Sequence, residues 1–155
     1  MLTFGDAALC YPLITAAHVL EEWHRFPAWA QRFASPRYSR REYERTHVAT
    51  LVVATSGALL VRIIPGSWST LVFFGLLFGP AVACNALFHI GASVVTRTFC
   101  PGVVTSAVLY VPATVVLIAA VLRDALLGPV ALGATLAVAA VLHVLEVGHN
   151  VFKRW

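Results

Sequence analysis

Five apolar segments, each long enough to cross a lipid bilayer as a helix, make up most of this sequence. They cover roughly residues 4–24, 47–64, 67–95, 102–123 and 126–152. A hydrocarbon layer about 30 Å thick is crossed by a helix of about 20 apolar residues. Only 12% of the residues are charged, whereas a soluble domain carries about a quarter. The sequence therefore predicts an all-α fold, a polytopic membrane bundle of about five transmembrane helices that forms one domain.

Basic residues mark one side of this bundle. Six arginines lie between the first two segments: Arg25, Arg32, Arg37, Arg40, Arg41 and Arg45. Arg97 follows the third segment, and Lys153, Arg154 and Trp155 follow the fifth. Because cytoplasmic loops are rich in Lys and Arg, this bias predicts an outside N-terminus and a cytoplasmic C-terminus in a bacterial inner (plasma) membrane. The net charge of +4 then reflects topology, and no nucleic-acid partner is expected.

The loop over residues 25–46 mixes its arginines with aromatic residues. These aromatic residues are Phe26, Trp29, Phe33, Tyr38 and Tyr43. Such a composition suits a segment that lies along the anionic inner leaflet, with rings in the lipid and guanidinium groups at the phosphates. Arg40, Arg41 and Arg45 are therefore expected to bind lipid head groups. A polybasic surface stretch without that role is the alternative.

His18, Glu21 and Glu22 lie at the end of the otherwise apolar first segment. Spacings of three and four place His18 on one helix face with both carboxylates. A carboxylate near hydrocarbon is costly, and such groups usually mark function. One imidazole and two carboxylates suit a metal centre or a proton-transfer site. Glu21 and Glu22 are also the candidate catalytic bases.

Other segments bring matching groups to the same cytoplasmic level. Glu44 and His47 form the i, i+3 pair that di-iron four-helix proteins project into their cores. Including the first segment, eight residues are candidate metal ligands: His18, Glu21, Glu22, Glu44, His47, His89, His143 and Glu146. Four more are expected to support these ligands or to join them: Asn85, His149, His24 and Asn150. The fourth segment has no histidine or charged residue before Arg123 and is expected to be a wall of the bundle.

Imidazole nitrogen and carboxylate oxygen together suit a borderline divalent metal. One zinc ion needs three or four ligands, so eight candidates predict a divalent transition-metal site with two ions, of iron or zinc, with manganese also compatible. A single ion whose ligands are held by many further groups is the alternative. The site would be buried in the bundle and open toward the cytoplasm.

Several short motifs carry a family resemblance. They are His18-Val19-Leu20-Glu21-Glu22-Trp23, Phe26-Pro27, Asn85-x-x-x-His89 and the turn Cys100-Pro101-Gly102. In this combination the chain resembles the HXXEE-domain family of small integral membrane proteins, from the first segment into the fourth. The resemblance implies the fold and the site and leaves the reaction open. The cluster of His143, Glu146 and His149 lies outside it.

Four functions fit this pattern. The favoured one is an oxygen-activating oxidoreductase with a dinuclear centre that acts on a lipid or other apolar substrate, although the HxxxH and HxxHH boxes of membrane desaturases are absent. A zinc-dependent lipid hydrolase with Glu21 or Glu22 as base is the second. A metal-free isomerase that moves protons on a sterol- or terpene-like substrate is the third, and a metal carrier is the fourth. Gly75 and Gly79 offer a small-residue face for contacts within the chain or in an oligomer.

Overall fold

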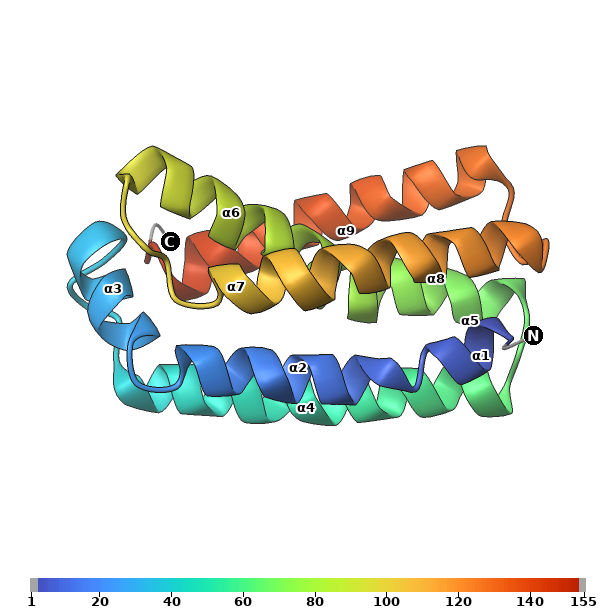
Figure 1. The fold of residues 1–155 in the computed structure, drawn as a ribbon, viewed down its shortest axis with the longest axis horizontal. Helices are drawn as coiled ribbons and strands as arrows, with labels where there is room; N and C mark the ends of the chain where they lie inside the picture. The colour runs from blue at the N-terminus through green and yellow to red at the C-terminus, as the bar shows by residue number, and fades with distance from the viewer. Residues whose placement is uncertain (1–2, 154–155) are drawn as a thin grey trace.

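Four helices are long and apolar enough to cross a membrane. They are α4 (Arg40–Ile63), a continuous helix over Ser67–Thr96, a second continuous helix over Val103–Arg123, and α9 (Pro129–Asn150). This computed structural model describes residues 3–153, and within that range it contains helices and connecting turns but no strand. Arg154 and Trp155, expected to anchor the C-terminus, lie outside the described residues. The all-α prediction is confirmed, and the four helices support the membrane class (Figure 1).

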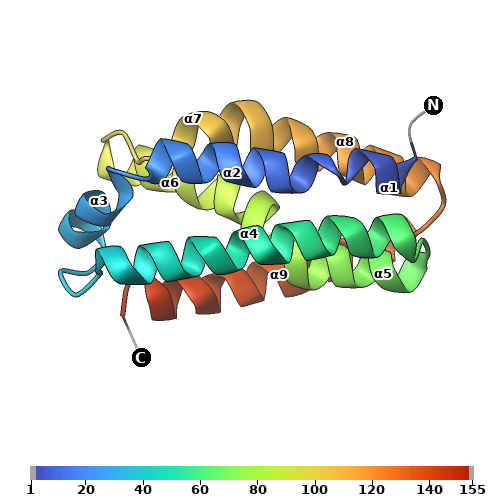
Figure 2. The same ribbon diagram turned by 90° about the horizontal axis from the view of Figure 1, so that it is seen from below.

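Two of these helices contain π-helical segments next to proline. The first consists of α5 (Ser67–Val72), η1 (Phe73–Leu77), η2 (Gly79–Cys84) and α6 (Asn85–Thr96), and the second of α7 (Val103–Thr105), η3 (Ser106–Tyr110) and α8 (Val111–Arg123). Pro80 lies in η2, and Pro112 follows η3. Proline lacks an N–H and pushes against the carbonyl four residues earlier, so a wider turn accommodates it. In Figure 2, α6 turns away from the line of α5.

The first apolar segment is split into α1 (Phe4–Ala7) and α2 (Cys10–Glu22). Pro12 stands in the first turn of α2 and has no N–H, and the carbonyl of Ala8 instead accepts a hydrogen bond from the Tyr11 N–H at 3.0 Å. The interruption of this segment therefore lies directly before Pro12. Together α1 and α2 run beside α4 along the bundle (Figures 1 and 2).

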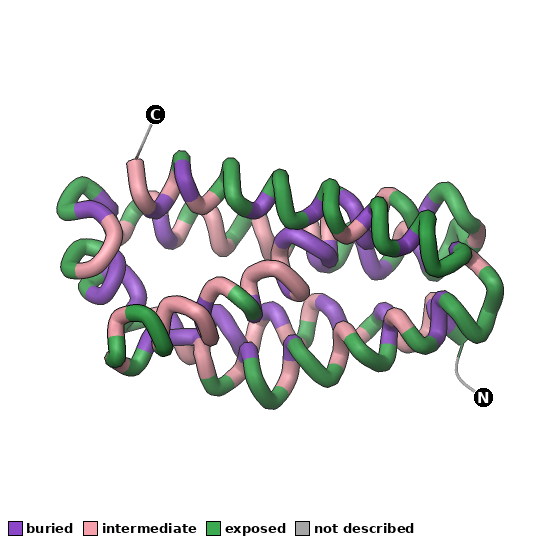
Figure 3. Tube along the Cα trace, turned by 90° about the horizontal axis from the view of Figure 1, so that it is seen from above, coloured by how far each residue is buried: buried purple, intermediate pink, exposed green. Residues whose placement is uncertain are grey.

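The outer faces of the long helices carry exposed apolar side chains. Val95 and Val130 are 83% and 88% exposed, and Leu87 on α6 is 69% exposed. Figure 3 shows that exposed residues recur along the outer faces, while buried residues lie toward the interior. Apolar groups face outward at no cost when the surroundings are lipid, because acyl chains are as apolar as these side chains.

The segment between α2 and α4 differs from its prediction. It forms α3 (Phe26–Phe33) and a turn that ends at Ser39, the N-cap residue of α4. Phe26, Trp29, Tyr38 and Tyr43 are buried, in one cluster with Cys100 and Val151. Their rings therefore pack inside the protein, where they cover the ends of α6 and α9, and do not reach into the lipid leaflet.

Glycines let η1 and η2 pack closely against α9. A Cβ atom at Gly75 would lie 3.3 Å from Thr135 Cγ2, and one at Gly79 would lie 2.7 Å from Ala139 Cβ. A Cβ at Gly79 would also lie 1.9 Å from the Phe74 carbonyl oxygen. The close helix contact expected of this small-residue face thus occurs within the chain. It sets the point where the Ser67–Thr96 helix crosses α9.

We predict that Gly79→Ala destabilises the bundle by about 1–3 kcal/mol, the usual effect of overpacking a core. The added methyl group must displace α9 or the Phe74 carbonyl. Titration with SDS in mixed micelles, followed by tryptophan fluorescence, measures the free energy of unfolding. Gly91→Ala on α6 is the control, because no atom lies within 4 Å of the Cβ it adds. Equal stability of the two variants would show that the crossing tolerates a side chain.

Candidate metal centre

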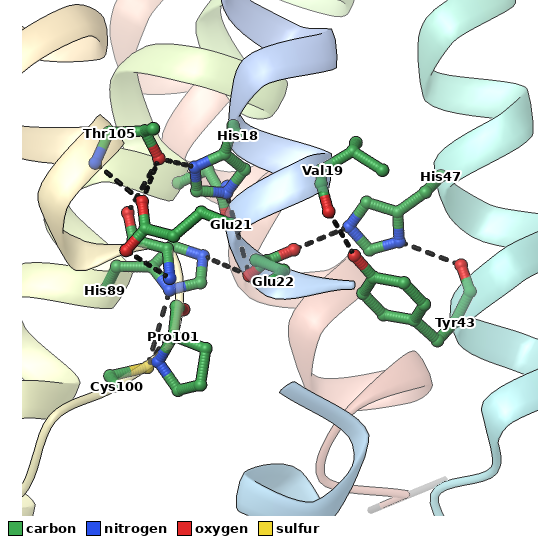
Figure 4. A network of polar contacts seen from close by, with 12 residues as sticks. His18, Val19, Glu21, Glu22, Tyr43, His47, His89, Cys100, Pro101 and Thr105 are labelled. Atoms are coloured by element: carbon green, nitrogen blue, oxygen red, sulfur yellow. Dashed lines mark hydrogen bonds and ion pairs between the residues drawn. The ribbon is translucent and has the colours of Figure 1, made fainter. Parts of the chain in front are cut away.

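A buried carboxylate, that of Glu22, lies between three imidazoles at one end of the bundle (Figure 4). Glu22 is 1% exposed. Its Oε1 lies 3.1 Å from His89 Nε2 and 3.7 Å from His18 Nε2, and its Oε2 lies 2.8 Å from His47 Nε2. Helices α2, α4 and α6 supply these groups. The described residues include no Lys or Arg paired with Glu22, so imidazoles are its ionic partners.

The other nitrogen of each ring also has a hydrogen-bond partner. His47 Nδ1 lies 2.8 Å from the Tyr43 carbonyl, which can only accept. His18 Nδ1 lies 2.7 Å from Thr105 Oγ1, whose own hydrogen goes to Glu21 Oε2 at 2.6 Å. The Nδ1 atoms of His47 and His18 therefore carry a proton, and their Nε2 atoms are the basic nitrogens. His89 Nδ1 lies 3.4 Å from Cys100 Sγ, a thiol that can either donate or accept.

This arrangement needs a positive charge at its centre. The Nε2 atoms of His18 and His47 and the Glu22 carboxylate are all acceptors, and at 2.8–3.7 Å they repel one another unless protons or a cation lie between them. The ligand atoms of His18, Glu22 and His89 all lie within 4.8 Å of one another, which makes these buried residues a group that could hold a metal ion. Asn85 Nδ2 also reaches His18 Nε2, at 3.1 Å.

Glu21 has a different role from Glu22. Its Oε1 accepts hydrogen bonds from the backbone N–H groups of Gly102 and Val104, both at 3.1 Å. Its Oε2 accepts from the Thr105 N–H at 2.7 Å and from the Thr105 hydroxyl. Glu21 thus caps the N-terminus of the Val103–Arg123 helix, where unpaired N–H groups favour an anion. Glu21 is thus bonded as a helix cap, and Glu22 is the carboxylate of the two that faces the imidazoles.

The turn before that helix closes the site. Gly102 has a φ of 95°, and a Cβ atom there would lie 2.7 Å from His18 Cε1, 2.8 Å from His89 Cε1 and 2.9 Å from Glu22 Oε1. Only glycine fits between these groups. Burial, with the nearby Glu22 and Glu21 charges, raises the pKa of the Cys100 thiol to about 12. Cys100 therefore remains a neutral thiol beside His89.

Aromatic rings fix the imidazole orientations. Tyr110 stacks on His18 with ring centroids 4.5 Å apart, and Tyr43 lies against His47 at 3.9 Å. Phe26 of α3 approaches His89 at 5.6 Å. These contacts leave the Nε2 atoms directed at Glu22 and separate them from lipid.

A family profile described as "Protein of unknown function with HXXEE motif" matches residues 9–117. The chain belongs to the HXXEE family. No curated protein and no solved structure matches it. In the HXXEE motif of this chain, His18 and Glu22 belong to the buried cluster and Glu21 is the helix cap. The matched residues also include His47, His89 and the turn at Gly102, whereas α9 lies beyond them.

The structure brings together only part of the predicted ligand set. Glu44 is 45% exposed, and its Oε1 pairs with Arg40 Nε at 2.8 Å, one turn earlier on the same helix face. Glu146 is 46% exposed on α9, and His24 and His149 are exposed as well. His143, Glu146 and Asn150 line the same chamber as Glu22, but none of them joins the group that could hold a metal. Among the described residues, one group of three could therefore hold an ion.

The three arginines predicted to bind lipid head groups differ in their surroundings. Arg40 pairs with Glu44, lies 4.6 Å over the Trp23 ring and donates to the Trp23 carbonyl. Arg41 and Arg45 are exposed, and Arg45 lines a cavity between α4 and α9. Binding of lipid head groups by these residues remains a prediction.

Sequence reasoning missed three groups at the site: Thr105, Cys100 and Gly102. The Cys100-Pro101-Gly102 turn carries part of the family resemblance, and Thr105 lies in the segment expected to be a wall of the bundle. The sequence does contain one signal for them. Gly102 lies three residues before Thr105, at the start of a helix that has no Ser, Thr, Asp or Asn at its N-cap position. The N–H groups at this helix end therefore need a carboxylate from another part of the chain as their acceptor.

We predict that Glu21→Gln lowers the free energy of unfolding by about 2 kcal/mol, since charge-assisted hydrogen bonds to buried backbone groups are lost. The metal ligands themselves are unchanged. SDS unfolding in mixed micelles measures the effect. Glu44→Gln is the matched control, because it removes only a half-exposed ion pair, which is typically worth less than about 1 kcal/mol. A Glu21→Gln variant as stable as Glu44→Gln would contradict the capping role.

Proposed function

We propose that this protein is a membrane-embedded metalloenzyme that holds one divalent transition-metal ion between His18, Glu22 and His89. The observation that supports this most is the buried Glu22 carboxylate, whose oxygens face basic Nε2 atoms and no Lys or Arg within residues 3–153. A cation bound by these atoms removes their mutual repulsion. The two-ion version loses support, because Glu44 and Glu146 lie outside the cluster.

The ligand set indicates the reaction class. Two histidines and one carboxylate, with further positions open, form the set used by non-haem iron(II) oxygenases. Bound iron would supply oxygen activation there. A zinc hydrolase would need a separate carboxylate base for water, but Glu21 is occupied by four hydrogen bonds and Glu146, at the chamber wall, is half exposed. We therefore favour an oxidoreductase that acts on a lipid or other apolar substrate.

The chain's own residues prepare the site for such a reaction. His47 holds Glu22 Oε2 at 2.8 Å and so leaves Oε1 directed toward His18 and His89. Thr105 and Cys100 fix the ring positions through Nδ1. Groups that orient ligands in this way commonly change metal affinity about 10–100-fold when they are removed.

Metal-free acid–base catalysis is the second candidate, and the His47–Glu22 pair favours it. If His47 carries a proton on both nitrogens, the pair is an imidazolium next to a carboxylate and can move a proton to or from an apolar substrate. His18 and His89 would then orient Glu22. An isomerase of a sterol- or terpene-like substrate fits this alternative.

We place the site on the cytoplasmic side of a bacterial plasma membrane, with the N-terminus outside. At the end that carries the site lie seven arginines and a lysine: Arg25, Arg32, Arg37, Arg40, Arg41, Arg45, Arg97 and Lys153. At the opposite end, Arg62 and Arg123 pair with Asp6 and Asp124. The excess of basic residues at one end supports the orientation through the positive-inside rule.

We expect purified protein to contain about one divalent transition-metal ion per chain, a single ion satisfying three or four ligands. Inductively coupled plasma mass spectrometry measures the content. Glu22→Gln should lower metal affinity more than about 100-fold, beyond the usual effect of an outer partner, whereas His47→Ala should cost about 10–100-fold. Glu146→Gln is the control and should keep full occupancy. A folded, metal-free wild-type protein that takes up no added iron, zinc or manganese would contradict the metalloenzyme proposal and leave acid–base catalysis as the remaining candidate.

A second variant tests the site while every ligand stays in place. Gly102→Ala adds a methyl group 2.7–2.9 Å from atoms of His18, His89 and Glu22, so we expect metal to be lost. Cobalt(II) titration followed by visible absorption measures this. Gly133→Ala, where the added Cβ meets no atom within 4 Å, is the control. Normal cobalt binding by Gly102→Ala would place the metal elsewhere.

A further inference from the structure

The chamber around Glu22 is too small for a lipid. It has a volume of about 80 Å³, which accommodates an ion and a few water molecules. Ligand pockets for larger molecules usually measure about 300–1,000 Å³. The bulk of an apolar substrate must therefore lie in a neighbouring space, with only its reacting end near the chamber.

A groove between α6 and α9 provides such a space. Its volume is about 470 Å³. It lies beyond the crossing at Gly79 and Ala139, where α6 and α9 separate (Figures 1 and 2). Its rim includes Leu87 and Val144, which are 69% and 65% exposed. Because these positions lie within two of the apolar helices, the groove opens sideways toward acyl chains.

His143 connects this groove to the chamber. It lines both spaces, together with Phe88 and Val147. His143 is 7% exposed, yet neither ring nitrogen has a hydrogen-bond partner. The nearest carboxylate oxygen, Glu146 Oε2, lies 3.9 Å from Nδ1, beyond hydrogen-bond distance. A buried imidazole with two unpaired nitrogens is unfavourable in apolar surroundings and needs a polar partner.

The lining restricts the chemistry of that partner. Apart from His143, the groove residues are apolar or small: Cys84, Leu87, Phe88, Ala140, Val144, Val147, Gly148 and Phe152. No charged side chain is among them, so a phosphate or a quaternary ammonium group would find no counter-charge. A neutral imidazole offers one donor and one acceptor, which a hydroxyl group can match.

We infer that the α6–α9 groove binds a single-chain neutral lipid, a long-chain alcohol, with its chain between the two helices and its hydroxyl group on His143. This inference rests on the proposed function and names its substrate class. His143 is then a substrate-binding residue that holds the polar end of the chain at the wall of the metal chamber. The lipid bilayer delivers the substrate through the open side of the groove.

Photolabelling of the full chain in phosphatidylcholine nanodiscs tests this inference. The probe is hexadecanol with a diazirine in its chain, and the comparison is hexadecane with the same diazirine. Mass spectrometry of digests locates the adducts. We expect hexadecanol adducts to concentrate on α6 and α9 at the groove. His143→Phe should lower this labelling about tenfold, the effect of one lost hydrogen bond at the upper end of its usual range, and should leave hexadecane labelling unchanged.

Two tryptophan substitutions form a matched pair. Val144→Trp fills the groove and should abolish labelling there by both probes. Val115→Trp, at a position on α8 that is 61% exposed, adds the same bulk to another lipid-facing surface and should have no effect. Unchanged hexadecanol labelling in His143→Phe would overturn the inference, as would equal labelling of the two tryptophan variants. Unchanged hexadecane labelling of His143→Phe shows that the groove is still folded.

The same labelling with the Glu22→Gln variant separates this inference from the proposed metal chemistry. Groove labelling should persist, because the lipid contacts do not involve the ligands. Groove labelling of a wild-type protein that takes up no added metal would retain the lipid site and reject the metalloenzyme. A metal-loaded protein without groove labelling would retain the metal centre and reject the substrate class.

Discussion

The structure depends on the compensation of one buried negative charge. Glu22 lies at the end of α2, where three helices bring imidazole nitrogens to its two oxygens. A carboxylate buried without compensation would destabilise a bundle this small by several kcal/mol. The surrounding structure is arranged to hold the compensating groups: each Nδ1 has a hydrogen-bond partner, rings stack on the imidazoles, and Gly102 leaves room beside them. Folding of this end of the bundle and formation of the site are therefore the same event.

The groove beside the chamber follows from the geometry of the helices that form it. The glycine contact with α9 brings the two helices together near the middle of the bundle, and the π-helical segments turn α6 away beyond that point. The aromatic cluster of α3 and the following turn covers the ends of α6 and α9 at the site. This covering leaves the proposed groove between α6 and α9 as the lateral approach to the chamber for a large apolar molecule.

The sequence predicted which residues lie at the same depth in the membrane better than it predicted which of them contact one another. Hydropathy predicted the membrane bundle, and the one-sided distribution of histidines placed His18, His47 and His89 at a common end. Glu21 and Glu22 look alike in the sequence, but a difference of one residue is a 100° rotation on a helix, so one carboxylate caps a neighbouring helix and the other enters the core. Helical periodicity alone does not reveal which neighbour each face meets. The same uncertainty explains Glu146, which shares a broad arc with His143 yet lies half exposed.

The Glu21 cap has a mechanical consequence. It joins the end of α2 to the beginning of the Val103–Arg123 helix through four hydrogen bonds, close to His18 and Glu22. The cap therefore resists separation of these two helices near the site. A bulky molecule entering the proposed groove would separate α6 from α9, whereas His18 and Glu22 on α2 would stay in register with Gly102 and Thr105 through the cap.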